Sequence, residues 1–272
     1  MKEYVFRTIT KKHSTTFYYA SLFFPKHIRD DVYILYAFLR TADDLVDEKR
    51  DKEAFLKFKD QVYSTLDKNH ISDDVIIDSF LRIFHKYAFE KAYLNSFFSS
   101  LESDFTCPLQ ILTRKELQEY IYGVAGVVGI MMAKIMGLPE SFFHTAKEFG
   151  ELMQLINIMR DINEDYQKHR VYIPMEDMNR YGLSDINDYR NKSKSRFENL
   201  IRFEITMVLK KMDKLSRGIE NIPQPYRRPV KISRDVYKLV AHKIYKNPTL
   251  VWQTRVHISR FELFIIILRN LI

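Results

Sequence analysis

The sequence predicts an all-α protein, and three observations support this prediction. Apolar residues recur at three- and four-residue steps over long stretches, which is the period of a helix with one buried face. The strict alternation of a half-buried strand is nowhere sustained. Only seven glycines and eight prolines occur in 272 residues, so turn signals are sparse. With 46% hydrophobic residues the chain can bury a substantial core, and we expect one domain over residues 1–272.

In the first half of the chain, helical patterns begin after Pro25. The apolar residues of 26–48 repeat at helical steps, and a more charged helix is expected over 53–66. A further apolar-periodic stretch predicts a helix over 75–99.

The second half opens with a capping box, in which Thr113 and Glu116 satisfy free backbone N–H groups at a helix start. It predicts a helix over 117–136, which Gly137-Leu138-Pro139 then ends.

The remaining pattern predicts further helices over 141–168, over 194–219 and after Pro229. Residues 170–188 carry turn-forming residues and are expected to form a long loop.

Charge and cysteine content narrow the range of partners and compartments. The formal charge of +8 comes from lysines and arginines spread among acidic neighbours, which favours a solvated surface over a nucleic-acid site. Cys107 is the single cysteine, so no internal disulfide is expected. Residues 1–10 lack the apolar core of a signal peptide, and no apolar run reaches about 18 residues. We expect a cytoplasmic protein without nucleic acid as a partner.

The apolar C-terminal stretch, residues 261–272, is expected to dock on the core. Peripheral membrane contact is the alternative for this stretch, and its length excludes spanning.

A first carboxylate cluster lies at the end of the 26–48 helix. Asp43 and Asp47 stand four residues apart, so on a helix they share one face with about 6 Å of axial rise between them. Like charges at this spacing weaken a helix. One such pair is most often a solvated face. Within an apolar helix it favours a bound cation, and carboxylate oxygens suit Mg²⁺.

A second cluster repeats this spacing in the 141–168 helix. Asp161 and Asp165 are again four residues apart, and Gln154 and Asn157 extend the same stripe at steps of three and four. Apolar residues flank the stripe, so its polar groups would be buried at a cost unless they meet a ligand, a metal or a partner.

Together the two clusters predict chemistry on diphosphates. Opposed carboxylate pairs can hold divalent ions that neutralise a diphosphate as its C–O bond breaks. Arg40, Arg160 and Arg170 lie close to the clusters in the sequence and can bind the departing anion. An apolar cavity between helices would keep water from a carbocation.

At these residues the chain resembles the squalene/phytoene synthase family, the head-to-head prenyl synthases. The resemblance covers most of the chain and rests on four motifs in the family's order: 13–20 (HSTTFYYA), 35–48 with its Arg40 and Asp43-Asp44-Leu45-Val46-Asp47-Glu48, 120–129 (YIYGVAGVVG), and 154–165 followed by 170–174 (RVYIP). Asn163 and His169 stand where the family usually or often has glycine. The glycines of 120–129 permit either close helix packing or a substrate channel.

The resemblance implies the isoprenoid synthase fold, in which helices surround a central active-site cavity, and it implies roles for individual residues. The implied metal ligands are Asp43, Asp47, Asp161 and Asp165, with Asp44 and Glu164 in support. The residues implied to lie beside the reacting carbons are Tyr120, Gln154 and Asn157. Those implied to bind substrate are His13, Phe17, Arg40, Val124, Ala125, Arg160, Arg170 and Tyr237.

The implied reaction joins two prenyl diphosphates through a cyclopropyl diphosphate. It needs Mg²⁺, with Mn²⁺ as an alternative ion, and NADPH only if squalene is the product. We expect a monomeric phytoene synthase using geranylgeranyl diphosphate. The alternatives are synthases of squalene, dehydrosqualene or presqualene diphosphate, a class I terpene cyclase or chain-elongating synthase, and a non-catalytic assembly factor of the same fold.

Overall fold

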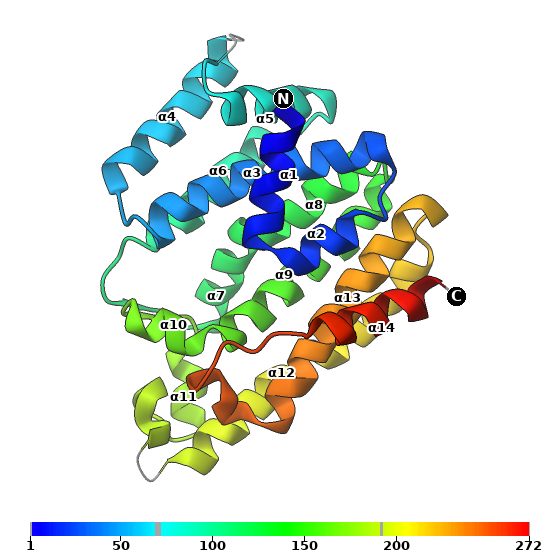
Figure 1. The fold of residues 1–272 in the computed structure, drawn as a ribbon. Coiled ribbons are helices and arrows are strands. Elements are labelled where there is room, and N and C mark those ends of the chain that lie inside the picture. The colour runs from blue at the N-terminus through cyan, green and yellow to red at the C-terminus, as the bar shows by residue number, and fades with distance from the viewer. Residues whose placement is uncertain (1, 69–71, 191–192, 272) are drawn as a thin grey trace.

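The computed structural model describes residues 2–68, 72–190 and 193–271, and nearly all of its regular structure is helical (Figure 1). The all-α prediction is confirmed. The longer helices are α1 (Lys2–His13), α3 (Lys26–Asp47), α4 (Lys52–Lys68), α5 (Val75–Lys86), α6 (Lys91–Ser103), α9 (Phe143–Arg160), α12 (Lys194–Glu220), α13 (Gln224–Lys246) and α14 (Arg260–Leu271). Shorter ones are α2 (Thr15–Ser21), α7 (Arg114–Ile121), α8 (Val127–Ile135), α10 (Ile162–Gln167) and α11 (Met175–Arg180).

Several predicted helices are interrupted where a single residue departs from helical geometry. The 75–99 stretch is two helices, because Ala88 adopts a left-handed φ of 48° between them. The 141–168 stretch breaks at Asp161, whose ψ of 11° ends α9 before α10 begins. Residues 122–126 form a π-helical turn between α7 and α8. Thr113 caps α7 as expected, accepting from the N–H of Glu116.

The predicted loop over 170–188 is only partly irregular. It contains a two-residue strand, β2 (Arg170–Val171), and helix α11. Strand β2 pairs in parallel with β1 (Leu109–Gln110), and Leu109 lies opposite Arg170. Helix α13 begins at Gln224, five residues before Pro229. Pro225 lies in its first turn, where the fixed φ of proline suits a helix, and Pro229 lies inside the helix.

The apolar core forms two large clusters that share partners. One is built mainly on α3, α5, α6 and α8, and it contains Phe38 stacked on Phe80 at 3.6 Å between ring centroids. The other is built mainly on α9, α12 and the end of α13. Val124 and Phe149 pack against both clusters, so the π-helical turn and the middle of α9 lie between them. The prediction of one domain stays a prediction.

Helices α8 and α9 approach closely, and this places α9 with its polar stripe. A Cβ on Gly129 would lie 2.1 Å from the Ala146 carbonyl oxygen, and a Cβ on Gly150 would lie 2.3 Å from that of Ala125. The glycines of 120–129 were expected to permit either close helix packing or a substrate channel, and Gly129 permits close packing. Among the described residues no helix is long and apolar enough to cross a membrane.

Candidate active site

The first carboxylate cluster occupies the last turns of α3, around the guanidinium of Arg40. Arg40 Nη1 lies 2.8 Å from Asp43 Oδ2, and Nη2 lies 2.5 Å from Asp44 Oδ1 and 2.8 Å from Glu48 Oε1. Burial, followed by the charge of Asp47, raises the pKa of Asp43 to about 7 despite Arg40. The cluster thus carries more negative charge than one arginine neutralises.

The second cluster spans the junction of α9 and α10. Although the helix breaks at Asp161, the N–H of Asp165 donates to the Asp161 carbonyl at 2.9 Å, so the two residues keep the predicted one-turn spacing. Asp161 pairs with Arg160 at 2.5 Å and with Arg255 at 3.0 Å, and these arginines lower its pKa against the effect of burial. Burial and the charges of Asp161 and Asp47 raise the pKa of Asp165 to about 8.

The two clusters face each other, because Arg170 crosses between the segments that carry them. The buried Arg170 side chain donates to Asp47 at the end of α3 and, at 3.4 Å, to the carbonyl of Val46. Its backbone is held in place by the β1–β2 pairing. Arg50 donates to the carbonyl of Lys168 at 3.2 Å, a second link between the same two segments.

The buried carboxylate of Asp104 lies next to Arg170. Asp104, at the end of α6 and 2% exposed, accepts hydrogen bonds from the hydroxyls of Tyr120 at 2.9 Å and Tyr172 at 2.7 Å. The two rings stack at 4.9 Å. Burial raises the pKa of Asp104 to about 6, while Tyr172 and Arg170 oppose the rise. The Tyr120 hydroxyl is therefore held by Asp104, which in turn lies close to Arg170 and Asp47.

Gln154 and Asn157 lie half-buried on α9, as the stripe predicts. Asn157 Nδ2 donates to Gln154 Oε1 at 3.1 Å. The Oδ1 atom of Asn157 is buried and has no hydrogen-bond partner among the described residues. A buried acceptor of this kind costs free energy unless a ligand or water satisfies it.

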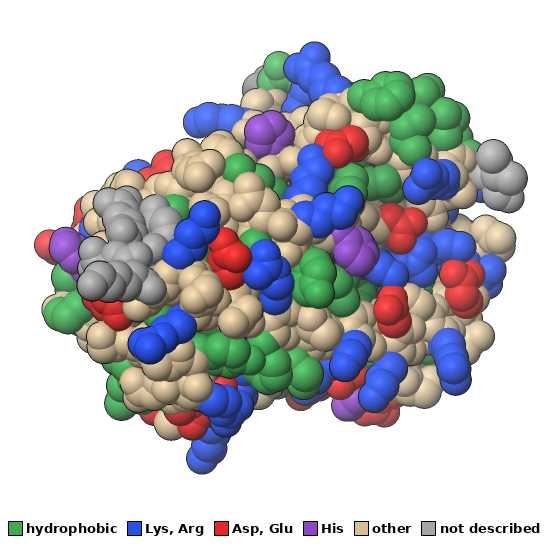
Figure 2. All heavy atoms as spheres, turned by 90° about the horizontal axis from the view of Figure 1, so that it is seen from below, with side chains coloured by type: hydrophobic (Ala, Val, Ile, Leu, Met, Phe, Trp, Pro, Cys, Tyr) green, Lys and Arg blue, Asp and Glu red, His purple; other side chains and the backbone are tan. Residues whose placement is uncertain are grey.

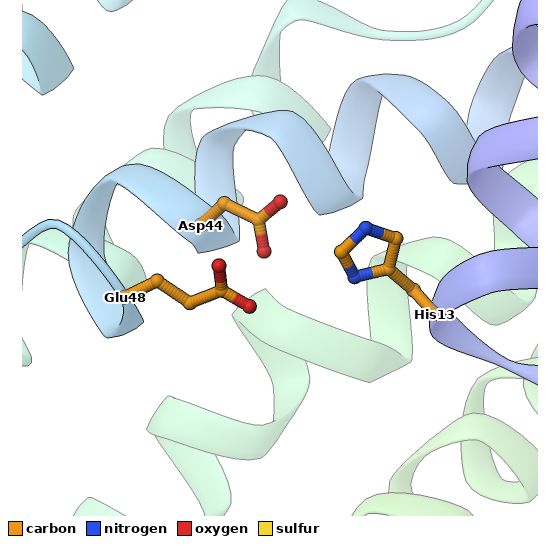
Figure 3. Close-up of side chains that lie close together, drawn as sticks. All are labelled: His13, Asp44 and Glu48. Atoms are coloured by element: carbon orange, nitrogen blue, oxygen red, sulfur yellow. The ribbon is translucent and has the colours of Figure 1, made fainter.

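His13 ends α1 and faces the first cluster (Figure 3). One ligand atom each of His13, Asp44 and Glu48 lie within 4.8 Å of one another. The predicted diphosphate contact of His13 would therefore be made beside Arg40, which already pairs with both carboxylates.

The other predicted substrate residues lie around the same region. Phe17 on α2 stacks on Tyr36 of α3 at 5.3 Å. Tyr237 on α13 is half-buried and lies close enough to Tyr36 and Arg160 to affect their pKa values. Val124 and Ala125 belong to the π-helical turn.

Glu164, implied as a supporting metal ligand, is about half exposed and pairs with Lys168 at 3.0 Å. It lies near enough to Asp165 and Arg160 to affect their pKa values, and its role stays a prediction.

Two residues of this region were missed by the sequence analysis. Asp104 is a lone acid without a spaced partner, and Arg255 lies in an irregular segment 94 residues from Asp161. The sequence gives little indication of a role for Arg255, because it is an arginine with no acidic neighbour in the sequence.

Two facing carboxylate clusters with arginines on either side, set in an all-helical fold, are the features of a prenyltransferase that acts on diphosphates. The family model described as squalene/phytoene synthase matches residues 10–262, and the chain belongs to this family.

Similar proteins carry the same chemistry. The chain is 26% identical over 260 residues to a 4,4'-diapophytoene synthase of Staphylococcus haemolyticus, covering 93% of this chain and 90% of the relative. It is 25% identical over 268 residues to a 15-cis-phytoene synthase of Synechocystis, covering 93% and 79%. The crystal structure of a dehydrosqualene synthase superposes with a TM-score of 0.85 at 25% identity, covering 99% of this chain and 95% of that one. The protein is thus a prenyltransferase of the head-to-head condensing type.

Proposed function

We propose that the protein is a Mg²⁺-dependent phytoene synthase that joins two molecules of geranylgeranyl diphosphate through a cyclopropyl diphosphate. The observation that carries the proposal is the pair of facing carboxylate clusters. Burial, followed by the charges of neighbouring carboxylates, raises the pKa values of Asp43 and Asp165, and buried carboxylates gathered in this way fit divalent cations. The C20 substrate follows the phytoene synthases among the relatives.

In the mechanism, each set of residues has a distinct task. Asp43, Asp47, Asp161 and Asp165 would hold Mg²⁺, or Mn²⁺ in its place, with Asp44 in support. Bound Mg²⁺ supplies positive charge to the leaving diphosphate. Arg40, Arg160, Arg255 and His13 add donors on the same side, and Arg170 fixes the orientation of Asp47.

On the other side of the diphosphates the chain would shelter the reacting carbons. Phe17, Val124 and the π-helical turn offer apolar walls, while Gln154 and Asn157 present amide dipoles toward the developing cation. Tyr120 would hold its hydroxyl in place through Asp104. We expect the enzyme to act as a cytoplasmic monomer.

The same geometry serves farnesyl diphosphate, and one observation favours that alternative. The 4,4'-diapophytoene synthase and the dehydrosqualene synthase are named for C30 products, and they are as similar to the chain as the phytoene synthases. Squalene would require NADPH in addition, and presqualene diphosphate would be the product if the reaction stopped halfway.

The decisive experiment offers purified protein each prenyl diphosphate with Mg²⁺, with and without NADPH. Released diphosphate is quantified and the extracted lipid is identified by mass. We expect phytoene from geranylgeranyl diphosphate, without NADPH. A C30 hydrocarbon made from farnesyl diphosphate would support the farnesyl alternative instead. Absence of diphosphate release from both substrates would favour the assembly-factor alternative.

Matched variants test the proposed metal ligands. Asp43→Asn and Asp161→Asn should each lower kcat by at least about 100-fold, because each removes a charge at the leaving group. Asp213→Asn is the control, since Asp213 is exposed on α12 and pairs with Lys238. Wild-type turnover in both active-site variants would contradict the assignment.

A further inference from the structure

Helix α14 has apolar side chains on its outer face as well as on its inner face. Leu263 and Ile266 are buried against Ile232 and Val236 of α13, so the inner face already completes the core. Figure 1 shows α14 lying along α13 at the edge of the molecule.

The exposed residues of this helix are mostly large and apolar. Phe261 is 71% exposed, Phe264 54%, Leu268 39% and Leu271 43%. Their spacing of three, four and three residues puts them on one stripe. Figure 2 shows hydrophobic side chains gathered at the upper right, at this end of the molecule. A surface helix normally presents charged residues here.

The exposed charged residues of α14 itself are both positive. The two other exposed residues of α14 are Arg260 and Arg269, at its two ends, and no ion pair joins either to an acid within the described ranges. The one acid of the helix, Glu262, is turned aside: its carboxylate accepts from Lys243 at 2.7 Å and from the Ser259 N–H at 2.7 Å. The stripe formed by Phe261, Phe264, Leu268 and Leu271, with both arginines, is called the α14 face below.

We propose that the α14 face docks on an anionic lipid surface, with the helix lying in the plane of the interface. Phenylalanine and leucine side chains would enter the acyl boundary, while the arginines at either end would contact lipid phosphates. The helix has 12 residues and is about 18 Å long, so it lies on a bilayer and does not cross one.

Area and charge favour lipid over a second copy of the chain. The exposed apolar area of the α14 face is roughly 400 Å², about half of what one partner buries in a standard protein interface. A symmetric pairing of two such faces would also bring their arginines together, whereas an anionic surface complements them. The benefit rests on the proposed function, because its product is a hydrocarbon that dissolves in lipid and not in water.

The test uses the full chain and measures sedimentation with vesicles. We expect binding to vesicles of phosphatidylcholine with 30% phosphatidylglycerol, weaker binding to phosphatidylcholine alone, and a decline with added salt. Removing each arginine should weaken binding roughly fivefold. Phe264→Ser with Leu268→Ser should weaken it by more than about tenfold.

Leu112→Ser with Met207→Ser is the matched control, because these side chains are 54% and 40% exposed but lie elsewhere on the chain. Equal binding by the two double variants, or no binding by the wild type, would overturn the inference. So would a dimer in solution that the Phe264 and Leu268 substitutions dissociate. Diphosphate release in detergent micelles is measured in parallel, so that loss of the proposed function is distinguished from loss of lipid binding.

Discussion

Arg170 joins two parts of the site that are distant in the sequence, and its position depends on residues behind it. Its guanidinium reaches Asp47, while Asp104 lies near enough to affect its pKa. Asp104 in turn uses both carboxylate oxygens to hold Tyr120 and Tyr172. A change at Asp104 should therefore act on catalysis through other side chains.

Replacing Asp104 by asparagine should lower kcat by about 10- to 100-fold and raise the Mg²⁺ concentration needed for half-maximal activity. The amide keeps the size of the side chain but loses the charge opposite Arg170 and one of two acceptors, and outer residues of metal sites show effects of this size. Steady-state kinetics across a Mg²⁺ titration measures both quantities.

The control is Asp177→Asn, which removes another buried charge. Asp177 lies on α11 and pairs with Arg114 of α7. It should lower stability without changing the Mg²⁺ dependence. An unchanged Mg²⁺ requirement in Asp104→Asn would show that Asp104 is only a structural acid.

Among the elements, the close contact of α8 with α9 fixes how the polar stripe meets the rest of the site. Gly129 allows this contact, since the atom nearest to its missing Cβ is a backbone oxygen that cannot rotate away. Gly123 is similarly placed against Ser96 and Ser100 of α6. The small residues of 120–129 thus set the distances between three helices.

Gly129→Ala should destabilise the protein by at least about 2 kcal/mol, even though alanine favours helices, because α8 and α9 must separate. Activity should fall with it, as α9 carries Gln154 and Asn157. Thermal unfolding and turnover at a temperature where the variant is folded give both values.

Gly218→Ala is the comparison for this contact. Its Cβ would meet the side chain of Thr145 at 3.0 Å, which can shift by a rotamer change. We expect its stability to stay within about 1 kcal/mol of wild type. Similar stabilities for the two variants would mean that the α8–α9 distance adjusts freely.

Which elements could be predicted follows from what periodicity measures. It reports which face of a helix is buried, so it predicted α3 and α12 well. It does not report a local change of backbone direction, so it missed the breaks at Ala88 and Asp161, across which the apolar pattern continues. Likewise, Asp43 and Asp47 could be predicted as a pair because they stand four residues apart in the sequence. Arg255 could not be predicted, because only the folded chain brings it to Asp161.

At the scale of the whole molecule, the facing clusters concentrate negative charge, and this links stability to pH. Without metal, the pKa of Asp43 is raised to about 7 and that of Asp165 to about 8, mainly by burial. Between pH 4 and these values the folded protein binds more protons than the unfolded chain. This contribution to stability is complete below about pH 4 and is lost as the pH rises through 7 and 8.

The metal-free protein should therefore lose stability between pH 5 and pH 8, and Asp165→Asn should reduce that loss. Asparagine carries no charge at any pH, so the stability advantage of the variant over wild type should nearly vanish only below about pH 4, and it should grow by roughly 3–4 kcal/mol between pH 5 and pH 8. Mg²⁺ with inorganic diphosphate should stabilise the wild type more at pH 8 than at pH 5, because protons compete for the same oxygens. Urea unfolding of the wild type and the variant at both pH values, with and without Mg²⁺ and diphosphate, measures these free energies of unfolding. A variant less stable than wild type at pH 8 would mean that Asp165 has a compensating partner in the folded protein. The proposed cation site would then lose its electrostatic basis at that residue.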